Sequence, residues 1–246
     1  MPISPNSIIH FTKSKESLKG ILSDNFKLKY CREIMPFSDE QVVVYVPMVS
    51  FCDIPLSQVK EHIEKYGEYG LGLTREWAVK NKLNPVLYVE PSSHLSESYL
   101  AVINQFFPGA VEQSDEESQG LRNIADFLRY MKPYQGPLIR EGREHGSYRF
   151  SDEREWRFVP SHQAECEMLY TEHDGEGYRK KAALSLDALR LHFEPNDIKY
   201  IIIKDDSEIS EFISHLRGVK GGKYLFNDVD RLSARILTAE QIRSDF

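Results

Sequence analysis

The segment EREWRFVP carries the residue whose setting is most suggestive of chemistry, Glu155. Strand alternation places Glu153, Glu155 and Arg157 on one face and leaves Trp156 and Phe158 on the other, which we expect to face the core. A carboxylate fixed on a rigid strand beside a cleft can stabilise a developing cation or accept a hydrogen bond from a sugar hydroxyl. Glu155 is therefore the catalytic candidate, and an ion pair with a neighbouring arginine is its structural alternative.

Two further sets of polar residues follow apolar runs. His10 lies in the run IIHF, where a lone histidine is more often a core residue than a ligand or catalyst, and Thr12 fits a turn. Cys52 and Asp53 end a hydrophobic run, a place where mixed folds often expose functional groups. Asp53 also fits a turn ahead of Pro55.

Familiar catalytic motifs are missing from the sequence. It contains no P-loop, no GxSxG elbow, no HExxH, no EF-hand and no kinase set. The glycines of YGEYGLGL stand in the wrong order for a dinucleotide fingerprint. His162, Cys166 and His173 show no evident fourth ligand, so we expect no bound metal.

Apolar spacing and capping residues predict the elements that must position these candidates. Strands are predicted at 8–11, 71–73, 86–89, 155–159 and 199–204, and in two pieces around Pro47 within 41–54. Helices are predicted after Ser14, after Thr74, before Gly67, at 96–107, at 121–131, after Asp206 or Ser207, and at a Thr238–Gln241 capping box. Residues 112–120 and 140–154 are expected to form loops.

Strands appear in pairs and singly rather than in strict βαβ alternation. We therefore predict an α+β fold with a mostly antiparallel or split mixed β-sheet flanked by helices. The 246 residues can be organised around one core, so one globular domain over residues 1–246 is expected.

Composition excludes several classes of protein. Hydrophobic residues make up 41% and charged residues 28%, which is ordinary globular usage. The net charge of -7 gives no global attraction to nucleic acid, which is expected only as a substrate. Three widely spaced cysteines form no CxxC pair and fit a reducing cytoplasm. No apolar run approaches the roughly 20 residues that span a bilayer, so no membrane association is expected.

Several segments together resemble the AbiGi family of abortive-infection, or phage-defence, proteins. They are IIHFTKSKESLKGILSDNFKLKYC, VPMVSFCDIPLSQVKEHIEKYGEYGLGLTREW, NPVLYV, EREWRFVP and IKYIII, and the block from Val46 to Trp77 is the most specific. The resemblance covers most of the chain and keeps the order of the motifs. It implies an antiviral defence role in bacteria, as the antitoxin-like partner of a nucleotidyltransferase-like toxin, and hence a protein partner.

A more distant resemblance is to DarT-like ADP-ribosyltransferases. The HFT-type first strand and the late strand with a glutamate carry it, and it implies an ADP-ribosyltransferase-like fold with NAD as cofactor. On that resemblance His10 and Thr12 contact NAD, and Glu155 stabilises the oxocarbenium-like transition state. Arg32 substitutes for the pyrophosphate-binding arginine, since Asp53 occupies the place where a basic residue would be expected.

Tyr66 or Tyr69 would stack on the nicotinamide ring, with packing as the ordinary alternative. Three functions remain open at this point: a non-enzymatic antitoxin-like module that binds a protein, an NAD-using effector, and a metal-dependent nuclease built on Asp53 and the glutamates. Loss of NAD turnover in Glu155→Ala would identify the NAD-using effector. A metal requirement in a nuclease assay would identify the metal-dependent nuclease.

Overall fold

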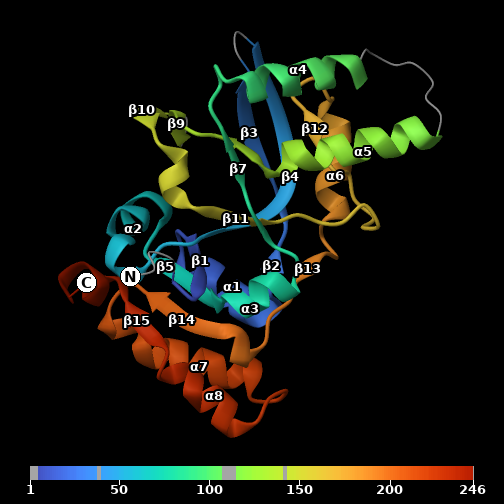
Figure 1. Ribbon diagram of the computed structural model, residues 1–246. Helices are drawn as coiled ribbons and strands as arrows, with labels where there is room; N and C mark the ends of the chain where they lie inside the picture. The colour runs from blue at the N-terminus through green and yellow to red at the C-terminus, as the bar shows by residue number, and fades with distance from the viewer. Residues whose placement is uncertain (1–4, 38–39, 107–114, 141–142, 246) are drawn as a thin grey trace. The chain divides into compact units, whose positions relative to one another are not determined.

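The computed structural model describes residues 5–37, 40–106, 115–140 and 143–245 (Figure 1). The chain divides into two compact units, each assembled from separate stretches of sequence. Unit 1 comprises residues 1–27, 49–84 and 189–246, and unit 2 comprises residues 28–48 and 85–188. The expected single domain over residues 1–246 stays a prediction.

Unit 1 is built on a mixed sheet with the strand order β15–β14–β5–β1. Strand β1 (Ser7–Thr12) pairs antiparallel with β5 (Tyr69–Thr74), and β5 pairs antiparallel with β14 (Ile198–Ile203). Strand β15 (Ile236–Thr238) runs parallel to β14. The run of isoleucines in β14 is fully buried, as expected for a central strand.

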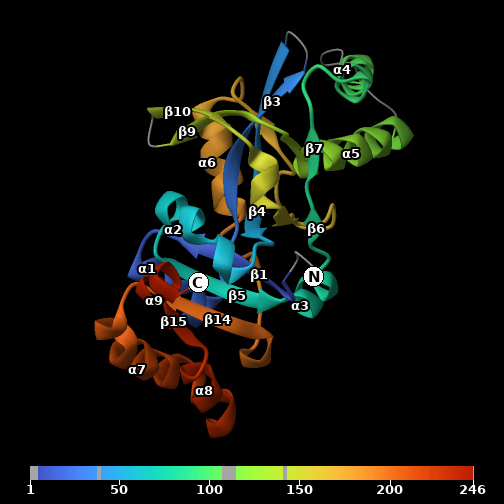
Figure 2. The ribbon, with the colours of Figure 1, turned by 60° about the vertical axis from the view of Figure 1, so that its left-hand side comes forward.

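Helices cover the sheet of unit 1. They are α1 (Lys15–Asp24), α2 (Lys60–Tyr66), α3 (Arg75–Lys80), α7 (Ile209–Lys220), α8 (Phe226–Ser233) and α9 (Ala239–Asp245). A buried cluster joins Ile9 of β1 and Ile202 of β14 to Ile63 of α2 and Ile242 of α9. Figure 2 shows α2 and α9 close together beside β1 and β5.

The capping residues predicted from the sequence start their helices as expected. Ser14 and Thr74 each accept a hydrogen bond from the backbone N–H three residues further on. Thr238 and Gln241 form the predicted reciprocal capping box. The segment before α7 differs, because the side chain of Asp205 caps a short 3-10 turn there.

Unit 2 is built around a long antiparallel hairpin. Strand β3 (Lys29–Phe37) pairs with β4 (Glu40–Cys52), whose last residues from Val49 on belong to unit 1. Strand β12 (Tyr170–Thr171) pairs antiparallel with β4, whereas β7 (Leu87–Val89) and β8 (Met131–Pro133) pair in parallel. The helices are α4 (His94–Phe106), α5 (Asp115–Tyr130) and α6 (Glu176–Ser185).

The remaining elements are short. In unit 2 they are β9 (Gly136–Arg140), β10 (Arg143–Tyr148), η2 (Phe150–Glu153) and β11 (Glu155–Phe158), and in unit 1 they are β2 (Phe26–Lys27), η1 (Leu56–Gln58), β13 (Arg190–Leu191), η3 (Pro195–Asp197) and η4 (Asp206–Glu208). The boundary strand is β6 (Asn84–Pro85). Both units combine helices with antiparallel and parallel strand pairs, so the predicted α+β class with a mixed sheet is confirmed.

Predictions about strand β4 and about two expected loops were wrong. The strand β4 runs through Pro47 without a break, because a proline interrupts a ladder only where its nitrogen would have to donate. Residues 115–120 belong to α5 rather than to a loop, and an acidic stretch is favourable at the start of a helix. Residues 112–114 lie outside the described part of the chain.

Within 140–154, strand β10 pairs with β9 as a hairpin instead of the predicted loop. Gly146, at φ 75°, lies where the register between β10 and β9 shifts. A charged sequence does not exclude an exposed hairpin, since neither face has to be buried. Residues 141–142 are not among those described.

In the described part of the chain, no helix has the length and apolar character that would be needed to span a membrane.

Candidate functional site

The catalytic candidate Glu155 is buried in unit 2 and held by two cations. Its residue is 5% exposed, and one carboxylate oxygen accepts a hydrogen bond of 2.6 Å from Nε of Arg157. The other oxygen lies 2.5 Å from Nζ of Lys132, which also bonds Glu153 at 2.8 Å. Burial alone would raise the pKa of Glu155, but the charges of Arg157 and Lys132 outweigh it and hold this pKa far below its usual value.

Arg157 is the centre of this buried network. Its side chain is fully buried and pairs with Glu33 of β3 at 3.0 Å as well as with Glu155. It also donates to the backbone carbonyls of Arg129 at 3.0 Å and Met131 at 3.3 Å. Burial lowers the pKa of Arg157, yet the two carboxylates raise it above its ordinary value. Such a set of contacts fixes β11 against β3, α5 and β8.

The predicted orientation of β11 was therefore wrong. Its alternation is as expected, but Glu155 and Arg157 form the buried face, and Trp156 and Phe158 are half-buried. Alternation defines two faces of a strand without saying which points inward, and hydrophobicity ordinarily decides. Here the opposite charges on neighbouring strands make burial of the charged face tolerable. The alternative of an ion pair between Glu155 and an arginine is confirmed.

His10, the first of the predicted NAD contacts, lies on β1 in unit 1 among aromatic side chains. Its Nδ1 donates to the carbonyl of Ser50 at 2.8 Å. The rings of Phe26 and Phe51 approach it edge-on, with centroids at 5.2 and 5.7 Å. These contacts satisfy a half-buried histidine within unit 1.

Thr12 and Tyr69 lie opposite each other in the register of β1 and β5. The buried hydroxyl of Tyr69 donates to Glu208 at 3.0 Å. Burial and the negative charge of Glu208 raise the pKa of Tyr69 to about 12. Tyr66, at the end of α2, stacks on His62 with ring centroids 5.6 Å apart.

Arg32 is the remaining predicted NAD contact, and it lies on β3 in unit 2. Its guanidinium pairs with Glu172 at 2.8 Å, and both side chains are substantially exposed. Arg32 and Glu155 thus belong to unit 2, whereas His10, Thr12, Tyr66 and Tyr69 belong to unit 1. Neither unit by itself contains the complete predicted NAD site, and the site stays a prediction.

Polar clusters of other kinds are present as well. Asp126 of α5 bonds Nε2 of His162 at 2.6 Å and Arg129 at 2.7 Å. Asp53, the nuclease candidate, is buried and paired with Arg75 at 2.7 Å. Among the residues that the structure describes, no group of three or more His, Cys, Asp or Glu side chains is arranged to hold a metal ion.

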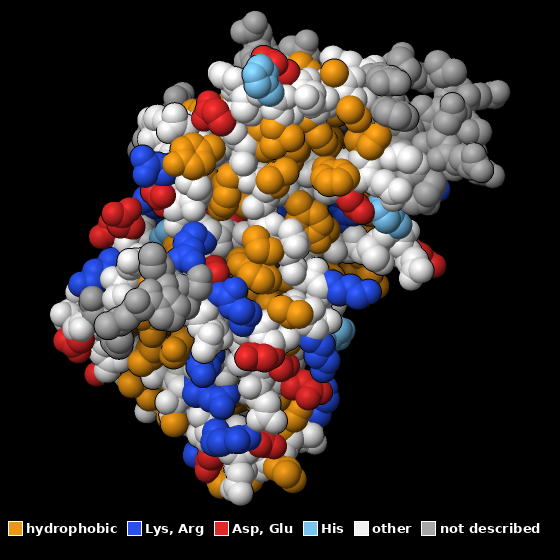
Figure 3. Space-filling view, in the orientation of Figure 1, with side chains coloured by type: hydrophobic (Ala, Val, Ile, Leu, Met, Phe, Trp, Pro, Cys, Tyr) orange, Lys and Arg blue, Asp and Glu red, His pale blue; other side chains and the backbone are white. Residues whose placement is uncertain are grey.

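Sequence reasoning missed an exposed apolar surface on unit 2. Figure 3 shows hydrophobic side chains gathered over α4, α5 and β7. Leu87 of β7 is 43% exposed, Leu95 of α4 is 50% exposed and Phe127 of α5 is 60% exposed. We call these three residues the apolar surface. The sequence did contain an indication of this surface, since Phe127 lies outside the row of apolar residues that was predicted to pack α5 against the core.

Neighbouring chain segments bring two of these residues near one another. Leu87 pairs with Met131 in the parallel register of β7 and β8. Met131 directly follows α5, and Phe127 lies one helical turn before it. Beneath them, Val89, Leu128 and Met131 belong to one buried cluster. The exposed side chains therefore rest on a packed core, as the anchor residues of protein interfaces do.

Comparison with known proteins identifies the family. Residues 24–204 match the AbiGi family of abortive phage resistance proteins, whose description names them antitoxins. The chain belongs to the AbiGi family. It is 28% identical over 240 residues to the abortive phage resistance protein AbiGi of Lactococcus lactis subsp. cremoris, covering 89% of this chain and 94% of that protein. The predicted membership of a phage-defence family is thereby confirmed, and no solved structure matches the chain.

Proposed function

We propose that this AbiGi chain is an antitoxin-like module of anti-phage defence that acts by binding a protein partner through the apolar surface. Its family description supports an antitoxin role. The observation that carries the proposal is the exposure of Leu87, Leu95 and Phe127 on one unit. Inhibition by binding requires a surface of this kind and no catalytic group of its own.

Energetics favour such a surface as an interface. Fully burying a Leu or Phe side chain contributes about 1.5–3 kcal/mol relative to leaving it in water. Aromatic anchors dominate measured interfaces, and a few residues carry most of the binding free energy. Phe127, at 60% exposure on a helix, is the anchor we expect. An acidic chain of net charge -7 also favours a partner with a basic rim.

The test is co-purification with the product of the neighbouring gene, followed by size-exclusion chromatography of the mixture. We expect a stable complex with the native chain and its loss in Phe127→Asp and Leu95→Asp. Leu225→Asp is the matched control, because Leu225 is 76% exposed but lies in unit 1. Loss of the complex in the control alone, or in none of the variants, would contradict this surface as the interface.

The ADP-ribosyltransferase-like activity with NAD stays a prediction. A transition-state carboxylate must reach the reacting sugar, and both oxygens of Glu155 are engaged by Arg157 and Lys132. That arrangement supports a structural role for Glu155 and ranks the binding function first. Release of nicotinamide from labelled NAD by the native chain, lost in a folded Glu155→Gln variant, would reverse this order.

A further inference from the structure

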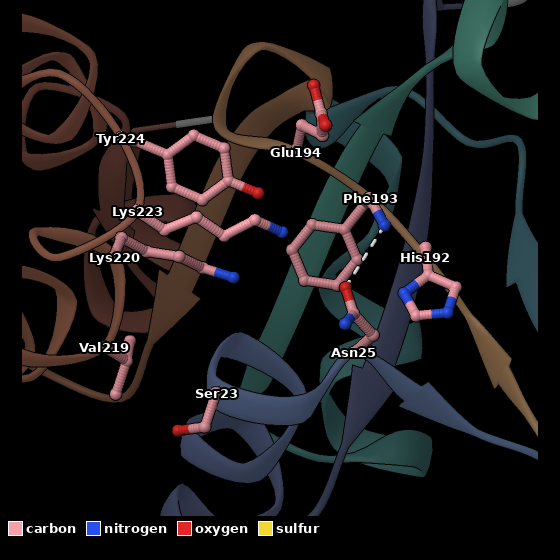
Figure 4. A pocket seen from close by; sticks show the side chains of 9 residues that line it. All are labelled: Ser23, Asn25, His192, Phe193, Glu194, Val219, Lys220, Lys223 and Tyr224. Atoms are coloured by element: carbon pink, nitrogen blue, oxygen red, sulfur yellow. Dashed lines mark hydrogen bonds between the residues drawn. The ribbon is translucent and has the colours of Figure 1, made fainter. Parts of the chain in front are cut away.

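Unit 1 contains a cavity of about 320 Å³. Its walls come from the end of α1, from the segment after β13 and from the end of α7 with the turn that follows (Figure 4). The lining residues are Ser23, Asn25, His192, Phe193, Glu194, Val219, Lys220, Lys223 and Tyr224. All of them belong to unit 1.

Lys220 is the unusual member of this lining. It is only 5% exposed, and among the described residues its ammonium group has no hydrogen-bonding or carboxylate partner. Aromatic rings surround it instead, with the centroid of Phe193 at 5.1 Å and that of Tyr224 at 6.0 Å. Burying a cation without an anion is unfavourable, because cation–π contacts offset only part of the hydration free energy that the ammonium group loses. An anion bound in the cavity would offset this cost, and none of the described residues supplies one.

A second cation faces the same space. Figure 4 shows Lys220 and Lys223 side by side, with both side chains extending toward the ring of Phe193. Burial and the like charge of Lys223 both lower the pKa of Lys220. The single acidic lining residue, Glu194, is exposed, and its carboxylate points away from both lysines in the figure. The lysine side of the cavity is therefore positively charged.

Asn25 adds a neutral donor to the lining. Its side-chain oxygen accepts from the backbone N–H of Phe193 at 3.2 Å, which leaves the NH₂ group available to donate. The backbone of Asn25 adopts φ 64° and ψ -174°, a conformation almost confined to glycine. Holding it there costs about 1–3 kcal/mol, and such strain clusters at ligand sites.

From this geometry we propose that the cavity binds a small phosphate monoester. Lysine ammonium groups act as point charges for phosphate, whereas planar carboxylates are matched best by the fork of arginine, which the lining lacks. A volume of about 320 Å³ lies at the small end of ligand pockets and suits a sugar phosphate or mononucleotide. This site is separate from the apolar surface of unit 2, so the two proposals stand or fall independently.

Calorimetric titration of the full chain with inorganic phosphate, ribose 5-phosphate and AMP tests the proposal. We expect saturable binding of at least one phosphate ester, stronger than that of inorganic phosphate and weakened by salt. In Lys220→Gln and in Lys223→Gln the affinity should fall at least about tenfold, the usual effect of losing a charge-assisted hydrogen bond. Lys199→Gln, an exposed lysine on β14 outside the cavity, should bind as the native chain does.

Two results would overturn the proposal. One is the absence of binding for all three probes to the native chain. The other is equal affinity in Lys223→Gln and Lys199→Gln; both positions are exposed, so this comparison holds even if Lys220→Gln fails to fold. Binding to inorganic phosphate with no gain for either ester would show an adventitious ion only and would equally contradict a phosphate-ester site.

Discussion

Arg157 shows how strongly one side chain can depend on its neighbours. Its guanidinium is fully buried and compensated by Glu155 and Glu33, which reach it from β11 and β3. A buried ion pair contributes little net stability when it is complete, because desolvation offsets the attraction. Removing one member is a different matter, since the charges left behind stay buried without compensation.

Arg157→Met is therefore expected to lower the free energy of unfolding by about 3–5 kcal/mol. Urea denaturation measures this loss. Arg32→Met is the matched control in the same unit, because its pair with Glu172 is exposed and should contribute less than about 1 kcal/mol. Equal losses of unfolding free energy in the two variants would contradict a larger contribution from the buried ion pairs of Arg157. The double variant Arg157→Met with Glu155→Gln should recover part of the loss.

Acid sensitivity gives a second prediction about this network. The pKa of Glu155 is lower in the folded chain than in the unfolded one, so its contribution to stability is present above pH of about 4.3 and is lost as the pH falls toward the folded value. Between pH 6 and pH 3 the native chain should therefore lose more stability than Glu155→Gln does. Urea midpoints across that range provide the measurement, and parallel pH profiles for the two proteins would contradict it.

At the scale of elements, glycine conformation decides how α2 ends. Gly67 has φ 118°, and a Cβ there would lie 2.4 Å from the carbonyl oxygen of Thr12. Gly20, in the middle of α1, has open space where its Cβ would be. Replacement by alanine should thus have opposite effects at the end of α2 and inside α1.

Gly67→Ala is expected to destabilise the chain by at least about 1 kcal/mol, from backbone strain and the clash with β1. Gly20→Ala should stabilise it by about 0.5–1 kcal/mol, because alanine loses less conformational freedom in a helix. Thermal unfolding by circular dichroism measures both. Two shifts of the same sign would contradict the described ending of α2.

Sequence reasoning located elements well where the signal is local. Ser14 and Thr74 cap their helices because a cap depends on residues three positions apart. The burial of Glu155 could not be predicted in this way, since it depends on Lys132, which lies 23 residues earlier in the chain. Its partner Arg157 depends in turn on Glu33, which is more distant still. The cavity beside Lys220 was missed for the same reason, because its walls come from three separate segments.

The whole molecule is assembled from interleaved stretches of chain. Unit 1 needs its last segment, from residue 189 on, because that segment supplies β14 between β15 and β5. It also supplies the carbonyl of His192, to which the indole N–H of buried Trp77 donates at 2.9 Å. Unit 1 can therefore be completed only after residues 189–246 have been synthesised.

A chain ending at Ala188 should consequently lose the ordered sheet of unit 1. Amide hydrogen exchange should show β1 and β5 unprotected, whereas a chain ending at Thr238, which lacks only α9, should retain part of that protection. The two truncated chains differ because only the longer one retains β14, whose isoleucines are fully buried in the sheet. Protected β5 amides in the shorter chain would refute this dependence.

The polypeptide passes between the units after Lys27, Met48, Asn84 and Ala188, and the second passage falls inside the continuous strand β4. This interleaving constrains how such genes can exchange parts. A single crossover between two related genes would combine segments of both parents within at least one unit and mismatch side chains that pack together. Transfer of unit 2 intact would need four junctions, one of them within a strand, so we expect relatives of this chain to diversify by substitution rather than by shuffling of the units.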